Sequence, residues 1–159
     1  MKHIVGVSDM KVTSDSKDTL VTYSLGSCIG ISIYDPRVKV GGILHYMLPD
    51  SRIDRAKAQN NPFMFADTGI PELFHAAIEL GASKERMKIV VAGGAQIMDE
   101  HGFFEIGKKN YVAAKKLLAR YKIKSDYEDV GGKINRTLIL SIQTGRTIIK
   151  AAGIGNLYI

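Results

Sequence analysis

The chain has 159 residues, of which 45% are hydrophobic and 24% charged, with a formal net charge of +6. This length favours a single folded domain, residues 1–159, whose core needs neither disulfides nor metal for stability. No apolar run reaches the length of a membrane span and no export signal is evident, so we expect a cytoplasmic protein without membrane insertion. The basic charge predicts acidic partners, but dispersed lysines and arginines argue against nucleic acid.

Short apolar runs predict strands in the first third of the chain, at residues 3–7, 19–25, 29–34 and 40–48. The last two runs flank the turn signal Asp35-Pro36 and predict a hairpin. Residues 12–18 are polar and predict a loop. Residues 50–61 show no periodicity and predict a second, longer loop, of the kind that often forms a lid or a binding segment.

The remainder of the chain mixes helices and strands. A helix capped by Asp67 or Thr68 ends near Gly81, and residues 109–122 form a clear amphipathic helix. A loop is expected at residues 102–107, and strands at residues 87–91, 127–130, 137–142 and 146–151, the last two as a hairpin. The sequence therefore predicts an α+β fold with about eight mostly antiparallel strands and two main helices.

Cys28 is the only cysteine, so it cannot form an internal disulfide, and a redox sensor would lack its resolving partner. It ends the segment Leu25-Gly26-Ser27-Cys28, between two predicted strands. Glycine permits a sharp turn there, and a thiol at such a junction is well placed to act as a nucleophile. The alternative is a small, buried and inert side chain, which is common for free cysteine.

A reactive thiol needs a base beside it. Among the four histidines, we favour His45, because it lies in an apolar strand expected to pair with the strand after Cys28. His45 could equally be a core histidine whose hydrogen bonds go to the backbone. Thr22 and Ser24, two residues apart on the preceding strand, are candidates to orient the imidazole, although threonine is also common in strands for its β propensity.

The sequence predicts no metal site and no cofactor. It contains no HxxxH or HExxH pattern and no paired cysteines. The segment Ala92-Gly93-Gly94-Ala95 follows a predicted strand but lacks the lysine and the Ser or Thr of a phosphate-binding loop. We interpret it as a tight turn or a close backbone contact.

Six short segments, spread over nearly the whole chain, match one family in the order that the family has them. They are Thr22-x-x-Leu25-Gly-Ser-Cys28, His45-x-x-Leu48-Pro49-Asp50-Ser51, Phe65-Ala-Asp-Thr68, Ala92-Gly-Gly-Ala95, Ile106-Gly107 with Asn110, and Asp129-x-Gly131-Gly132 with Arg136. On these segments the chain resembles the CheD family, the chemoreceptor glutamine deamidases of bacterial and archaeal chemotaxis. The resemblance implies an α/β sandwich similar to the catalytic domain of cytotoxic necrotizing toxins.

The resemblance also implies a catalytic triad, with Cys28 as nucleophile, His45 as base and then acid, and Thr22 as the residue that orients the imidazole. The implied activity is that of a protein-glutamine glutaminase, which passes through a thioester and extends to glutamyl methyl esters. Backbone groups near Gly26 and Ser27 would stabilise the oxyanion.

Three further residues, Ser51, Asp67 and Thr68, are implied to bind substrate or partner. The implied partners are the cytoplasmic helices of chemoreceptors and the CheC phosphatase. The alternative is a non-catalytic module that regulates receptors or this phosphatase by docking.

Overall fold

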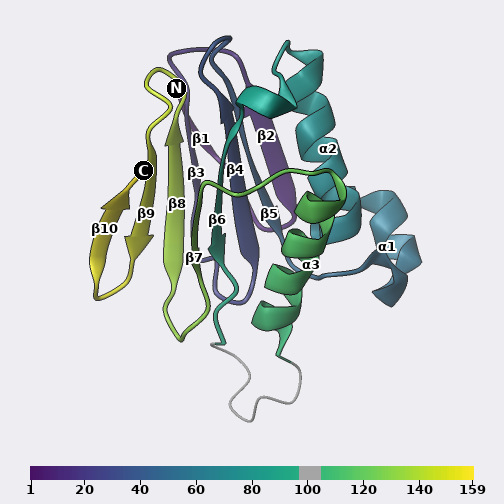
Figure 1. Ribbon diagram of the computed structural model, residues 1–159. Coiled ribbons are helices and arrows are strands. Elements are labelled where there is room, and N and C mark those ends of the chain that lie inside the picture. The colour runs from purple at the N-terminus through teal and green to yellow at the C-terminus, as the bar shows by residue number, and fades with distance from the viewer. Residues whose placement is uncertain (97–104) are drawn as a thin grey trace.

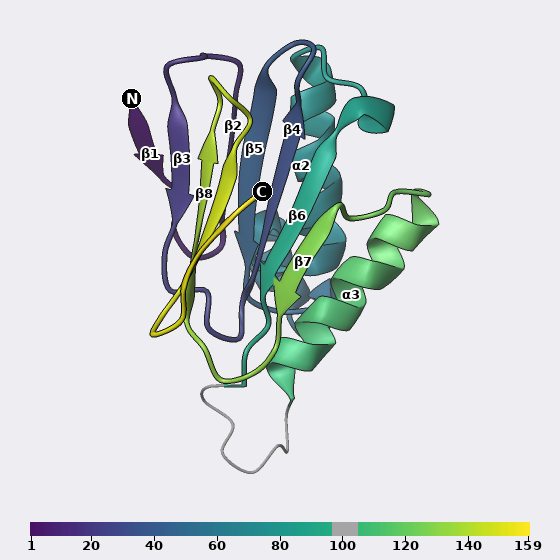
Figure 2. The same ribbon diagram turned by 60° about the vertical axis from the view of Figure 1, so that its left-hand side comes forward.

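The computed structural model describes residues 1–96 and 105–159. Three layers make up this part of the chain: a first β-sheet, a second β-sheet, and helices on the outer face of the second sheet (Figures 1 and 2). The first sheet contains, in spatial order, β1 (Lys2–Ile4), β3 (Thr19–Thr22), β8 (Arg136–Ser141), β9 (Thr147–Ala151) and β10 (Gly155–Tyr158). The second contains β2 (Asp9–Thr13), β5 (Val40–Tyr46), β4 (Ile29–Asp35), β6 (Lys88–Gly93) and β7 (Tyr127–Val130).

Two main helices, α2 and α3, and a short one, α1, accompany these strands in the described ranges. Their bounds are α1 (Arg55–Asn60), α2 (Ala66–Glu79) and α3 (Ile106–Arg120), with single 3-10 turns η1 (Ser51–Ile53), η2 (Pro62–Met64) and η3 (Lys84–Arg86). Neighbouring strands are antiparallel except for the pairs β1–β3 and β6–β7. The predicted α+β class with mostly antiparallel strands is therefore confirmed.

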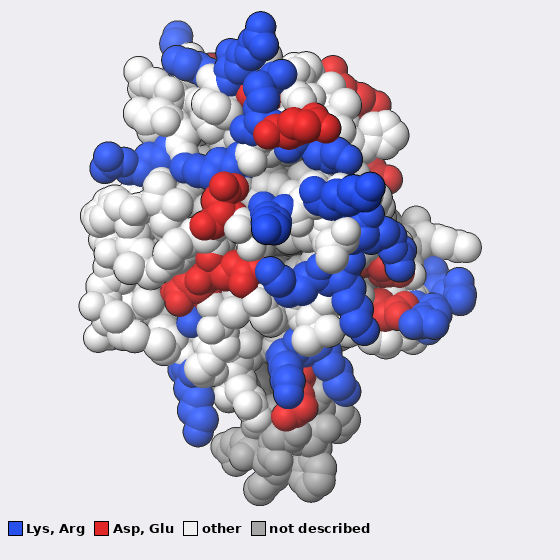
Figure 3. Space-filling model, in the orientation of Figure 1, with Lys and Arg blue, Asp and Glu red and all other residues white. Residues whose placement is uncertain are grey.

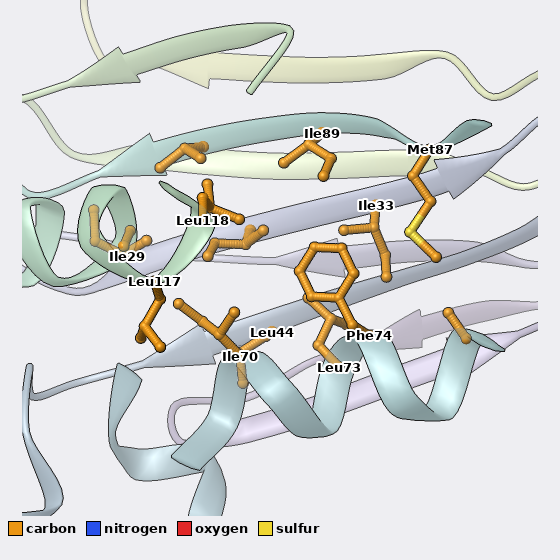
Figure 4. Close-up of a cluster of buried hydrophobic side chains, with 14 of the residues drawn as sticks. Ile29, Ile33, Leu44, Ile70, Leu73, Phe74, Met87, Ile89, Leu117 and Leu118 are labelled. Carbon is orange, nitrogen blue, oxygen red and sulfur yellow. The ribbon is translucent and has the colours of Figure 1, made fainter. Parts of the chain in front are cut away.

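The hairpin of β4 and β5 lies at the centre of the second sheet and is buried along its whole length. Because side chains alternate between the faces of a strand, both of its faces need a hydrophobic partner. One face packs against the first sheet, through residues such as Leu25, Ile43 and Leu138. The other face meets the helices. There Ile29, Ile33 and Leu44 pack against Ile70, Leu73 and Phe74 of α2 and against Leu117 and Leu118 of α3 (Figure 4).

The predicted hairpins are confirmed, since β4 pairs with β5 and β8 with β9 in antiparallel register. The predicted loops were partly wrong. Residues 50–61 contain η1 and α1, and Asp54 caps α1 by accepting a hydrogen bond from the Lys57 N–H. None of the side chains of α1 is buried, so this helix has no apolar periodicity for the sequence to show.

The strands β2 and β10 were missed for a similar reason. Four of the five residues of β2 are exposed or only partly buried, and β10 is exposed throughout, so neither has a strong apolar pattern. The helix α2 begins at Ala66, and neither predicted cap occupies the N-cap position, because Asp67 and Thr68 lie inside its first turn. Of the loop expected at 102–107, residues 102–104 lie outside the described ranges.

Candidate active site

Cys28 ends a tight turn that leads directly into β4. The Cys28 N–H closes the turn by donating to the Leu25 carbonyl at 2.7 Å, and Gly26 adopts a φ of +51°, in the left-handed region that favours glycine. The Cys28 carbonyl in turn accepts from the Gly94 N–H at 2.8 Å. At Gly93 (φ +112°) a Cβ would collide with that carbonyl, so the close approach of β6 to the turn requires glycine.

Asn110 joins this turn to the strand that carries His45. It is fully buried near the N-terminal end of α3, and its Nδ2 donates to the Ser27 carbonyl at 2.9 Å and to the Met47 carbonyl at 2.8 Å. Its own backbone carbonyl accepts from the Tyr46 hydroxyl at 2.6 Å. Sequence reasoning gave Asn110 no role. A polar residue in line with the apolar positions Ala114 and Leu117 of an amphipathic helix was the available signal.

His45 is fully buried on β5, directly opposite Gly30 of β4. Its Nδ1 lies 2.7 Å from the Oγ1 of Thr22, which reaches across from β3 in the first sheet. The same Oγ1 lies 2.7 Å from the Val5 carbonyl. A carbonyl only accepts and a hydroxyl has one hydrogen, so Thr22 donates to Val5 and accepts from Nδ1–H of His45. This chain of bonds fixes the histidine tautomer and leaves a lone pair on Nε2.

The Nε2 atom is buried and has no hydrogen-bond partner in the described ranges, the Cys28 thiol included. Burial disfavours the imidazolium and lowers the pKa of His45 to about 4. Burial also raises the pKa of the Cys28 thiol to about 11. At neutral pH both groups are therefore uncharged, so a nucleophilic role of the thiol would require a base that takes its proton during the attack.

This uncharged state can be tested by alkylation with iodoacetamide, since Cys28 is the only thiol. Only the thiolate reacts, so a pKa raised to about 11 predicts that the rate is still climbing above about pH 9. The measurement is the labelling rate from pH 6 to 11, followed by intact mass. The urea-unfolded chain is the control and should level off earlier. A plateau by about pH 7 in the folded protein would instead indicate a stored thiolate.

The backbone donors near Cys28 are not equally available. The Gly26 N–H donates to Asn135 Oδ1 at 3.1 Å, and the Cys28 N–H is used by the turn. The Ser27 N–H donates to no residue of the described ranges. Of the predicted oxyanion groups, Ser27 therefore has the donor that is still available, whereas Gly26 shapes the turn.

The other predicted residues lie in two further places. Ser51 donates to Asp67 through its N–H at 2.9 Å and its hydroxyl at 2.6 Å, and the Thr68 hydroxyl donates to the Pro62 carbonyl at 2.5 Å. These bonds tie η1 and η2 to α2. A role of Ser51, Asp67 and Thr68 in binding stays a prediction. Ser24 lies beyond the end of β3 with a φ of +54°, so it does not share a strand face with Thr22 as expected.

Two other histidines are engaged elsewhere. His3 Nε2 lies 3.0 Å from an Asp18 carboxylate, and the exposed His75 lies 3.8 Å from Glu79. His101 lies outside the described residues.

In residues 1–96 and 105–159, no group of three or more acidic, histidine or cysteine side chains is arranged to hold a metal ion. No helix within the same ranges is long and apolar enough to cross a membrane.

Fold and site together define an α+β sandwich with a free cysteine and a buried histidine–threonine pair. The cysteine directly precedes β4, and the histidine lies on the neighbouring strand β5. Residues 47–151 match the family described as CheD chemotactic sensory transduction. A probable chemoreceptor glutamine deamidase CheD of Syntrophus aciditrophicus is 53% identical over 150 residues, which cover 94% of each chain. Its counterpart in Solibacter usitatus is 49% identical, over 94% of this chain and 89% of the relative. The chain belongs to the CheD family.

Among solved structures, a DUF152 protein of Neisseria meningitidis has a similar fold, with a TM-score of 0.51 at 10% identity. The match covers 83% of this chain and 64% of that protein. At this identity the likeness concerns the fold alone. The predicted similarity to the toxin catalytic domain stays a prediction.

Proposed function

We propose that this protein is a chemoreceptor glutamine deamidase, a protein-glutamine glutaminase that converts chosen receptor glutamines to glutamate and ammonia. Its relatives, which are named probable chemoreceptor glutamine deamidases, support this activity and this substrate. The observation that carries the proposal is the hydrogen-bond chain from Val5 through Thr22 to His45. It leaves Nε2 as a free base on the strand that pairs with β4, the strand that begins directly after Cys28. A core histidine kept only for packing would not need an unpartnered, buried nitrogen.

In the first half of the reaction, Cys28 Sγ attacks the side-chain carbonyl carbon of the glutamine. His45 Nε2 takes the thiol proton as the S–C bond forms, because both groups are uncharged at rest. The carbonyl oxygen becomes an oxyanion, which the Ser27 N–H stabilises. Loss of such a donor typically lowers the rate by about 10²–10³-fold. The C–N bond then breaks, the imidazolium returns its proton to the leaving nitrogen, and ammonia departs.

In the second half, His45 removes a proton from water as the water oxygen attacks the thioester carbonyl. The C–S bond breaks, the sulfur recovers the proton from the imidazolium, and glutamate is released. A glutamyl methyl ester would enter the same thioester with methanol as the leaving group. Throughout, the Thr22 hydroxyl accepts from Nδ1–H and holds the ring, but it contributes no negative charge to the imidazolium.

Further parts of the proposal rest on the family alone. The substrate segment is a cytoplasmic helix of a chemoreceptor, the reaction takes place in the cytoplasm, and CheC phosphatase is a second partner. We also propose that residues 1–159 form a single deamidase domain. The competing function is a docking module with no turnover, in which Cys28 and His45 would be dispensable.

The test is incubation of the pure protein with the cytoplasmic fragment of a chemoreceptor from the same organism. Peptide mass spectrometry should show conversion of particular glutamines to glutamate, and none with Cys28→Ala in parallel. Conversion that is equal in both samples would contradict a cysteine-dependent deamidase. If the wild type bound the folded fragment without converting any glutamine, the docking module would replace the enzyme.

A further inference from the structure

A groove of about 570 Å³ runs along the exposed side of α3, between this helix and the segment that follows β5. Its apolar lining comes from Pro49, Val112, Ala113 and Leu117. Basic side chains border it: Arg52, Lys108, Lys109, Lys116 and Arg120. Figure 3 shows lysine and arginine side chains gathered over the part of the molecule where Figure 1 places α3.

Four of these cations have no acidic partner among residues 1–96 and 105–159. Lys108, Lys109, Lys116 and Arg120 are exposed, and no ion pair joins them to any acidic residue of the described ranges. Lys109, Lys116 and Arg120 recur at intervals of seven and four residues, so they follow one another along a single face of the helix. The repulsion among them makes this face a site for a negatively charged partner.

The groove lining also contains three acidic residues, Asp50, Asp67 and Glu105. The Asp50 carboxylate forms an ion pair with Arg52, and the Asp67 carboxylate accepts two hydrogen bonds from Ser51. The positive field of the α3 face is thus offset only in part within the groove. A long, straight helix face with an apolar floor and a charged border is the form of site that accepts an amphipathic helix.

The N-terminal end of α3 connects the groove to the candidate active site. Asn110, next to Lys109 near the N-terminal end of α3, bonds to the Ser27 carbonyl beside Cys28. Pro49, which lines the groove, follows closely after Met47, whose carbonyl Asn110 also holds. With 15 residues, α3 extends about 22 Å away from that end. The end of the groove at the N-terminus of α3 is therefore the end nearer to the Cys28 turn.

We infer that this groove is the docking surface for an acidic amphipathic helix of the substrate, with acidic residues toward the lysines and arginine of α3. This inference rests on the proposed deamidase function and adds the surface that selects the substrate. Docking along α3 would place a glutamine at the end of the helix segment beside Cys28. Charge complementarity of this kind mainly raises the association rate and weakens with salt.

The test compares two double charge reversals with equal change in net charge. Lys109→Glu with Lys116→Glu alters the groove, whereas Lys11→Glu with Lys150→Glu alters exposed, unpaired lysines on β2 and β9. We expect the groove variant to bind the receptor fragment about tenfold or more weakly, with a raised KM, similar kcat and a flatter salt dependence. The control variant should stay within about twofold of wild type.

Binding is measured by titration on the Cys28→Ala background, so it does not depend on turnover. An unchanged rate of Cys28 alkylation in the groove variant would show that the active site is intact. Equal losses in both variants, or no loss in the groove variant, would overturn the inference. Tighter binding of duplex RNA than of the fragment, lost in the groove variant, would overturn it in favour of nucleic acid. If the wild type deamidates the fragment and the groove variant does so equally well, only the docking surface is contradicted. If the groove variant binds the fragment more weakly but the wild type does not deamidate it, only the deamidase activity is contradicted.

Discussion

Replacement of Cys28 by alanine should abolish deamidation of the receptor fragment, with a loss in kcat on the order of 10⁴-fold or more. The reason is that no other thiol exists in the chain and the thioester cannot form without it. The measurement is ammonia release under saturating fragment. Cys28→Ser should be nearly as inactive, since its hydroxyl is a much weaker nucleophile that the same neutral histidine would have to activate.

The protein should stay folded in both variants. The hydrogen bonds that hold the turn use the backbone N–H and carbonyl of Cys28 and not its side chain. Unchanged circular dichroism and unchanged fragment affinity are the controls. Retention of a tenth of the wild-type rate by Cys28→Ala would exclude this residue as the nucleophile.

The second large effect is expected at His45. His45→Gln keeps a polar side chain of similar size but removes the base, and should lower kcat by about 10²–10⁴-fold. Thr22→Val keeps the shape of threonine and removes only the hydroxyl between Val5 and His45. A neutral hydrogen bond of this kind contributes about 1 kcal/mol, so a loss of about fivefold is expected, with recovery in Thr22→Ser.

The ranking of the variants by rate shows whether the Thr22 hydroxyl only orients His45 or is as essential to catalysis as Cys28. Rates at saturating substrate should fall in the order wild type, Thr22→Ser, Thr22→Val, His45→Gln and Cys28→Ala. A Thr22→Val variant as inactive as Cys28→Ala would contradict the orienting role. Thermal unfolding of each variant is the control, because Thr22 and His45 are both fully buried.

The hairpin that relates Cys28 to His45 could be predicted from the sequence. Cys28 lies at a turn into one strand of a hairpin, and the hairpin brings Gly30 of that strand opposite His45. The contact of Thr22 with His45 joins two sheets, and no local pattern encodes how sheets are stacked. That contact was expected from the family resemblance, with Ser24 as an equal candidate on the residues alone.

The support around the site could not be predicted. The Val5 carbonyl is a backbone group that any residue supplies, so its bond to Thr22 has no sequence signature. The two bonds of Asn110 connect segments that are far apart in the chain. Exposed elements such as α1 and β10 bury too little apolar surface to show a periodic pattern.

The proposed thioester between Cys28 and the substrate predicts that hydroxylamine can trap an intermediate of the reaction. The reaction is run with the receptor fragment at increasing hydroxylamine, and the receptor peptides are analysed by mass spectrometry. Since a thioester reacts readily with this amine, a glutamyl hydroxamate should accumulate at the same positions that otherwise become glutamate, and none should form with Cys28→Ala. Formation of glutamate alone at every hydroxylamine concentration would contradict a covalent intermediate and indicate direct attack by water.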